Sequence, residues 1–138
     1  MSVLDMNDET LLTYLEESRE HLANIENNLL DIEEHGADID EELVNRVFRA
    51  AHSIKGGAGF FDLSKIRDLG HKIENVLDMI RSREMIPTPE IINILLISFD
   101  KLREMVNSPE FSNDMDIDEF VKSLEALTTE TLPEEKKE

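Results

Sequence analysis

The amino-acid sequence predicts an all-α fold, a four-helix bundle followed by a short fifth helix. Leucine, isoleucine, glutamate and aspartate dominate the composition, and the alternation of apolar and polar residues that marks strands is absent. Apolar residues instead recur every three or four positions in five separate stretches, as on the buried face of a helix. Three of the five glycines gather within residues 56–59.

The first helix is predicted to begin near residue 8 and to end near residue 35. Asp8 and Glu9 place negative charge at its positive N-terminal end, and Gly36 suits the position that follows its last turn. A single apolar seam runs along its whole length and consists of Leu11, Leu15, Leu22, Ile25, Leu29 and Ile32.

The second helix is predicted to open at a capping box, in which Asp38 is the cap and Glu41 lies three residues later. It runs to about Phe60. At about 100° per residue, its core-facing stripe consists of Val44, Val47, Phe48, Ala51, Ile54 and Ala58. His52 falls well off this stripe, on the face that also holds Asn45, Gly56 and Gly59.

The third helix follows the break at residues 62–64. Its inward residues are predicted to be Ile66, Leu69, Ile73, Val76, Leu77 and Ile80. His71 and Glu74 lie off this stripe at positions i and i+3, so both can line a groove between helices.

Thr88 and Pro89 predict the start of the fourth helix, as the cap and the first helical residue. This helix is nearly continuously apolar to about residue 106, which indicates contact with neighbours on two sides. A second capping box, with Asp116 and Glu119, opens the fifth helix. The apolar residues of the fifth helix are Ile117, Phe120, Val121, Leu124 and Leu127.

The chain is predicted to form one domain, residues 1–127, followed by a disordered linker or tail, residues 128–138. The periodicity ends at residue 128, and the last six residues are a proline and five charged residues. This charged end suggests that the chain led into further domains.

Because the formal net charge is −18, most of the surface should repel nucleic acid and anionic membranes. We therefore expect protein partners with basic patches. The absence of cysteine excludes disulfides and thiolate metal sites and agrees with a reducing cytoplasm. With neither an apolar run near 18 residues nor a signal-like leader, we expect a cytoplasmic protein without membrane insertion.

The glycine-rich turn of the second helix is the candidate functional site. Each glycine in a helix interior costs about 1 kcal/mol relative to alanine, so Gly56, Gly57 and Gly59 need an explanation. They follow His52 and Lys55, which lie at positions i and i+3. One interpretation is a solvated surface histidine on a helix that happens to be rich in glycine. The alternative is a bare patch that lets a large partner approach the imidazole.

Residues 52–58, His-Ser-Ile-Lys-Gly-Gly-Ala, resemble the phosphorylation site of histidine phosphotransfer (HPt) domains. Together with Gly59, Phe60 and residues 69–74, Leu-Gly-His-Lys-Ile-Glu, they are similar to the N-terminal P1 domain of the chemotaxis histidine kinase CheA. The match covers roughly residues 8–127. It implies an antiparallel up-down four-helix bundle with an additional short C-terminal helix, phosphorylation of His52, and His71 and Glu74 as the supporting pair.

The residues can support this chemistry, because a neutral imidazole is a nitrogen nucleophile near pH 7. Glu74 could accept a hydrogen bond from Nδ1–H of His52 and leave Nε2 free to attack. Lys55 could then screen the phosphoryl oxygens. We expect Gly56, Gly57 and Gly59 to serve partner docking.

The chain lacks a Gly-rich phosphate loop followed by Lys-Ser or Lys-Thr, so we expect it to bind no cofactor and not to phosphorylate itself. The resemblance implies that a kinase catalytic domain loads His52 from ATP. A CheY-like or CheB-like receiver domain would accept the phosphoryl group on an aspartate and supply Mg²⁺. By itself the domain is a carrier, although the resemblance is to part of a histidine protein kinase, which leaves its enzyme status open.

The residues leave three alternative functions open. A di-iron bundle needs repeated Glu-x-x-His pairs, whereas the sequence has one Asp68-x-x-His71 and a reversed His71-x-x-Glu74. A zinc site could use His52, His71 and Glu74, since two histidines and a carboxylate form a known zinc set. The third alternative is a helical adaptor without phosphoryl transfer.

Overall fold

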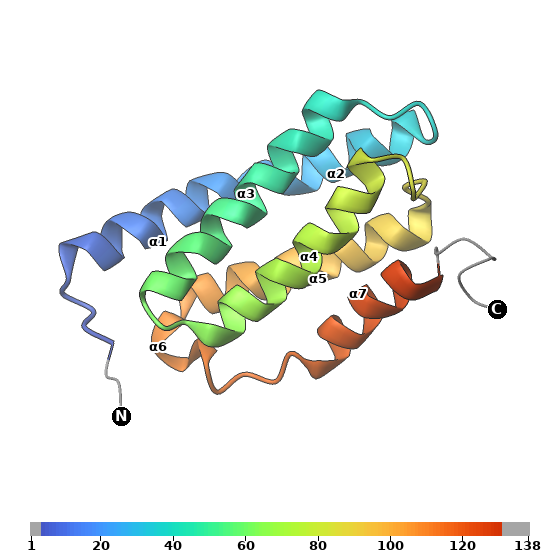
Figure 1. The fold of residues 1–138 in the computed structure, drawn as a ribbon. Coiled ribbons are helices and arrows are strands. Elements are labelled where there is room, and N and C mark those ends of the chain that lie inside the picture. The colour runs from blue at the N-terminus through green and yellow to red at the C-terminus, as the bar shows by residue number, and fades with distance from the viewer. Residues whose placement is uncertain (1–3, 131–138) are drawn as a thin grey trace.

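The computed structural model describes residues 4–130, and every regular element in this range is a helix (Figure 1). The all-α prediction is therefore confirmed. The elements are α1 (Glu9–Leu22), α2 (Ile25–His35), α3 (Glu41–Phe60), α4 (Ser64–Arg81), α5 (Pro89–Asn107), α6 (Pro109–Ser112) and α7 (Asp118–Glu130).

Four antiparallel arms form a bundle, and one further helix packs on its outside. α1 and α2 lie end to end as the first arm, and α3, α4 and α5 are the other three (Figure 1). The first arm contacts α3 and α5, and α4 contacts the same two helices from the opposite side. α7 packs against α4 and α5. This is the predicted up-down four-helix bundle with an additional C-terminal helix.

The core is built from the predicted apolar stripes. All six seam residues of the first arm are buried, and so are the six predicted inward residues of α4. Burying one such side chain contributes about 1.5–3 kcal/mol. Phe99 of α5 is the bulkiest fully buried side chain, and α5 contacts the first arm, α4 and α7, as its apolar sequence predicts. Within residues 4–130, no helix combines the length and apolarity needed to cross a bilayer.

The first arm is interrupted at Ala23 and Asn24, which corrects the prediction of one continuous helix. The Arg103 side chain of α5 donates a hydrogen bond of 2.9 Å to the carbonyl oxygen of Leu22. In a continuous helix that oxygen would accept from the amide four residues later. The ends of the arm match the prediction, because Asp8 accepts from the amide of Thr10 and Gly36 takes a φ of 57°.

The other differences concern the ends of helices. Asp40, not Asp38, caps α3 by accepting a 3.2 Å hydrogen bond from the amide of Leu43. Asp116 accepts from the amide of Asp118 at the start of α7, near the predicted position. α7 continues to Glu130, three residues beyond the predicted boundary at residue 127. The remainder of the predicted tail, residues 131–138, lies outside the described residues. The short α6 was not predicted.

Candidate functional site

The site lies where α3 and α4 approach each other closely, and Gly70 of α4 permits that approach. A Cβ atom added to Gly70 would lie 3.2 Å from Cβ of Lys55 and 3.7 Å from the carbonyl oxygen of Ala51, both on α3. The missing side chain therefore lets the backbones come near enough for polar side chains on neighbouring turns to meet.

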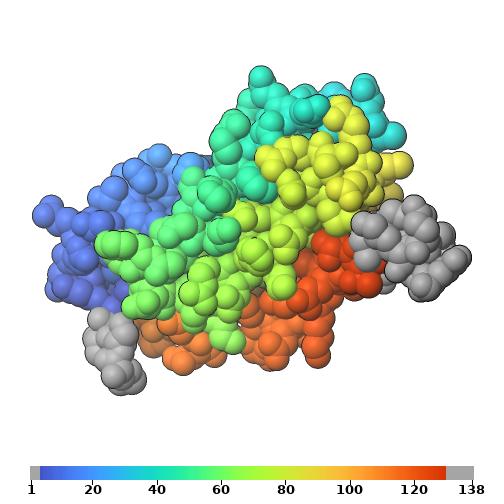
Figure 2. Space-filling view, viewed as in Figure 1, coloured from blue at the N-terminus to red at the C-terminus, as the bar shows by residue number. Residues whose placement is uncertain are grey.

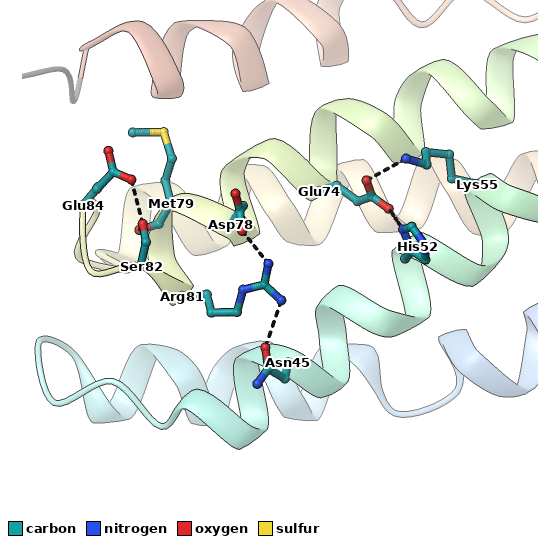
Figure 3. A network of polar contacts seen from close by, with 9 residues as sticks. All are labelled: Asn45, His52, Lys55, Glu74, Asp78, Met79, Arg81, Ser82 and Glu84. Atoms are coloured by element: carbon teal, nitrogen blue, oxygen red, sulfur yellow. Dashed lines mark hydrogen bonds and ion pairs between the residues drawn. The ribbon is translucent and has the colours of Figure 1, made fainter.

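His52, Lys55 and Glu74 form a hydrogen-bonded trio at this contact (Figure 3). Glu74 Oε2 lies 2.7 Å from Nδ1 of His52, and Lys55 Nζ donates to Oε1 at 2.8 Å. Because the carboxylate can only accept, the Nδ1 atom of His52 carries the proton, and the neutral ring keeps its lone pair on Nε2. The His52 side chain is 63% exposed, so the nucleophilic part of the ring is accessible.

Glu74 is buried, with only 9% of its side chain exposed. The sequence places it off the apolar stripe of α4, in a groove, but the structure encloses it between α3 and α4. A buried carboxylate is costly unless it is paired and hydrogen-bonded. Here one oxygen serves His52 and the other serves Lys55, so both oxygens have partners.

Lys55 has a partner in the unphosphorylated chain. Its amine pairs with Glu74. The role of Lys55 in screening phosphoryl oxygens stays a prediction, and it requires the amine to shift from the carboxylate toward Nε2.

His71 lies outside the trio. It is exposed on α4, one turn before Glu74, and it lines a groove together with Lys55 and Gly56. Its predicted supporting role stays a prediction. In residues 4–130, no three histidine, aspartate or glutamate side chains converge as metal ligands, so the arrangement does not assemble the zinc set of His52, His71 and Glu74.

The groove beside the trio has a volume of about 660 Å³ and is formed by α3, α4 and the start of α7. Figure 2 shows α3, α4 and α7 next to one another on this face of the molecule. Four basic residues and two acidic ones line the groove, in a chain whose net charge is −18. The charged residues are Lys55, Lys65, Arg67, Lys72, Asp68 and Asp118. Three of these basic side chains are ion-paired with Glu74, Asp68 and Glu125, so the groove is less acidic than the chain as a whole but carries little excess positive charge.

The three glycines after His52 have different surroundings. A Cβ at Gly56 would meet nothing within 4 Å, and one at Gly59 would meet only Arg67 Cδ at 3.9 Å, so these two leave a bare surface beside the groove. A Cβ at Gly57 would collide with the ring of Tyr14 on α1. Packing against Tyr14 thus accounts for Gly57, which was predicted to serve docking together with the other two.

Tyr14 anchors α1 to the site helix. Its hydroxyl donates a 2.7 Å hydrogen bond to the carbonyl oxygen of Ile54, one turn from Gly57. Burial raises the pKa of Tyr14 to about 12, against a smaller lowering by a hydrogen bond with Ser18. The hydroxyl therefore remains a donor throughout the physiological pH range.

Alanine substitutions at Gly56 and Gly57 are expected to change stability in opposite directions. Gly56→Ala should raise the free energy of unfolding by up to about 1 kcal/mol, since alanine is the better helix former and the space is open. Gly57→Ala should lower it by about 1–3 kcal/mol, because the added methyl displaces the Tyr14 ring. Urea denaturation of both variants measures the difference. Equal effects would contradict the separate roles of the two glycines.

Two residues near the trio were not predicted from the sequence as part of the site. The Phe48 ring is stacked on the His52 ring, with centroids 6.0 Å apart and planes inclined by 11°. Arg81 of α4 lies over the Phe48 ring, with its guanidinium carbon 4.0 Å from the centroid. The i, i+4 spacing of Phe48 and His52 could have revealed the stack. The sequence assigns Phe48 to the core stripe, but it is only partly buried.

A family model for the Hpt domain matches residues 9–108 of the chain. The chain therefore belongs to the Hpt domain family, the class that the helical bundle and the exposed, carboxylate-bonded histidine define.

Within this family, the chain is similar to the histidine phosphotransfer domains of CheA. The chemotaxis protein CheA of Rhizobium meliloti is 37% identical over 134 residues, which cover 95% of this chain and 17% of that protein. CheA of Klebsiella aerogenes is 39% identical over 115 residues, or 83% of this chain and 17% of that protein. The chain thus spans about a sixth of the length of these relatives.

Two solved structures share the fold. One is a solution structure of the histidine phosphotransfer domain of CheA, with a TM-score of 0.74 and 30% identity, covering 88% of this chain and 92% of that one. The other is the CheA phosphotransferase domain from Thermotoga maritima, with a TM-score of 0.65 and 34% identity, covering 72% of this chain and 93% of that one.

Proposed function

We propose that this chain carries a phosphoryl group on Nε2 of His52, between a CheA-type kinase catalytic domain and the receiver domain of a response regulator. The observation that supports this most directly is the 2.7 Å contact between His52 Nδ1 and a buried carboxylate, on a ring that is 63% exposed. This contact holds the proton on the inner nitrogen and leaves the outer nitrogen as the nucleophile.

In the loading step, Nε2 forms a bond to the γ-phosphorus of ATP held by the kinase domain, and the bond from that phosphorus to ADP breaks. The ring then carries positive charge with a proton on Nδ1, and Glu74 stabilises that charge. In the second step, an aspartate oxygen of the receiver forms a bond to phosphorus and the N–P bond breaks. The neutral imidazole returns with Nδ1–H still bound to Glu74.

The two transfer steps determine which domain binds each cofactor and which domains are partners. ATP and Mg²⁺ belong to the partner domains, and this chain binds neither by itself. CheY-like and CheB-like receivers are the proposed acceptors, in keeping with the similarity to CheA. The bare surface at Gly56 and Gly59, beside the groove between α3, α4 and α7, is the proposed docking face for both partners.

The test is a two-stage transfer assay with purified proteins. The chain is incubated with a CheA catalytic domain, Mg²⁺ and ³²P-labelled ATP, and then with a CheY-like receiver. We expect acid-labile label on the chain, a mass increase of one phosphoryl group, and transfer of the label to the receiver. Binding of the kinase domain without any label on the chain would support the helical adaptor instead.

Gly56→Gln separates docking from chemistry. Gly56 is exposed with open space around it, so the longer side chain should leave the fold intact and obstruct the partner. We expect loading and transfer to slow by about tenfold, mainly through a higher KM. Asn27→Gln, at an exposed and uncharged residue of α2, is the control, because α2 does not line the groove. Unchanged kinetics in Gly56→Gln would remove Gly56 from the docking face.

A further inference from the structure

The imidazole of His52 has more freedom than its reaction allows if Glu74 is its only restraint. The ring turns about two side-chain bonds, and 63% of the side chain is exposed. A single hydrogen bond at Nδ1 fixes one atom of the ring but lets the ring plane tilt about the line from Nδ1 to Oε2. A phosphoryl donor must meet Nε2 along its lone pair, which lies in the ring plane.

Phe48 restrains that plane. It precedes His52 by four residues, so the two side chains are neighbours on the surface of α3. Their rings are nearly parallel, inclined by 11°, with centroids 6.0 Å apart, an offset stack within the usual range for paired rings. The stack opposes tilting of the imidazole plane, whereas the hydrogen bond alone does not prevent this tilt.

Phe48 is held in turn from α4. The Arg81 guanidinium carbon lies 4.0 Å from the centroid of the Phe48 ring, a cation–π distance. Arg81 donates a 3.1 Å hydrogen bond to Asn45 Oδ1 on α3 and pairs with Asp78 on α4. Figure 3 shows the guanidinium between Asn45 and Asp78, with the His52–Glu74 contact farther along the same pair of helices. The guanidinium is thus fixed to both helices, while Phe48 also packs against the core.

We propose that Phe48 and Arg81 are positioning residues for phosphoryl transfer: the column of Arg81, Phe48 and His52 fixes the plane of the imidazole, while Glu74 fixes its tautomer. This rests on the proposed function of His52. The two restraints are independent, because one acts on the ring face and the other on a ring nitrogen. Neither Phe48 nor Arg81 needs to touch the phosphoryl group.

Kinetics with two phosphoryl donors test the proposal. Phe48→Leu keeps an apolar side chain and removes the stack, whereas Phe48→Tyr keeps the ring. With the CheA catalytic domain, we expect Phe48→Leu to lower the rate constant at saturation by about three- to tenfold, with KM within about twofold. The small donor phosphoramidate, which needs no docking face, should show the same loss. Phe48→Tyr should restore both rates.

Arg81→Gln and Phe111→Leu complete the series. Arg81→Gln removes the cation from a partly exposed position. It should lower the rate of His52 phosphorylation by about two- to threefold with either donor. Phe111→Leu makes the same chemical change at an exposed phenylalanine on α6, and it should leave both rates unchanged. In the wild-type chain, NMR should show nuclear Overhauser contacts between the ring protons of Phe48 and His52.

The outcomes distinguish this proposal from the proposed function. If the wild-type chain accepts phosphoryl from neither donor, the proposed function fails. If the wild-type chain is loaded but folded Phe48→Leu reacts at the same rate, or Phe48→Tyr is as slow as Phe48→Leu, the positioning role is overturned. If Phe48→Leu does not fold, Arg81→Gln and the NMR contacts of the wild type test the proposal. Unchanged phosphorylation rates in Arg81→Gln, or no contact between the Phe48 and His52 rings, would overturn the positioning role.

Discussion

His52→Gln is expected to abolish phosphorylation of this chain. Glutamine has no nitrogen with a lone pair available for attack, because its amide nitrogen is delocalised and can only donate. Its amide can still donate to Glu74, and the site is 63% exposed, so the variant should keep its fold. Labelled ATP with the CheA catalytic domain should leave the variant without acid-labile phosphate. Circular dichroism should show the helix content of the wild type.

His21→Gln is the matched control, since His21 is another exposed histidine, located on α1 away from the trio. It should be loaded at the wild-type rate. The assignment of His52 would be wrong if His52→Gln reached the wild-type level of label, or if peptide mapping of the wild type placed the phosphoryl group on His71.

Removal of the Glu74 charge is expected to slow loading by about tenfold. Groups that orient a reacting ring or accept its charge commonly contribute 10²-fold or more, but a kinase domain supplies part of the stabilisation itself. Glu74→Gln is the sharper variant, because it preserves size and an acceptor for Nδ1–H while removing the charge. If charge is what matters, Glu74→Gln should be as slow as Glu74→Ala. If orientation is sufficient, it should react like the wild type.

Burial of Glu74 adds a stability effect that its place off the apolar stripe does not predict. The carboxylate accepts hydrogen bonds from His52 and Lys55. Glu74→Ala leaves both of these donors without their acceptor. We expect the free energy of unfolding to fall by about 1–3 kcal/mol. Rates are therefore compared at a temperature where urea denaturation shows each variant to be folded.

Glu125→Gln is the control for Glu74→Gln. Glu125 of α7 also forms an ion pair, with Lys72 at 2.7 Å, but its side chain is half exposed. Its substitution should change neither stability nor loading by much. Wild-type loading rates in both Glu74 variants would show that Glu74 is not the partner of His52 in the reaction.

The sequence by itself determined the fold class and the apolar faces of the main helices. Apolar spacing depends on positions three and four residues apart, so the seam of the first arm and the inward face of α4 could be predicted without tertiary information. The resemblance of residues 52–58 and 69–74 to the CheA P1 domain implied His52 and Glu74 as a pair, and the structure joins them at 2.7 Å.

Only the tertiary structure decided the features that depend on side chains from different helices. The interruption of the first arm coincides with a hydrogen bond from Arg103, eighty-one residues away in the chain. Gly57 is explained by the ring of Tyr14, and the stack on His52 is supported by Arg81, neither of which is a sequence neighbour. Lys55 pairs with Glu74 because Gly70 brings α3 and α4 together. Helical periodicity specifies which face a residue occupies, whereas the partner on that face is set by the packing of the neighbouring helix.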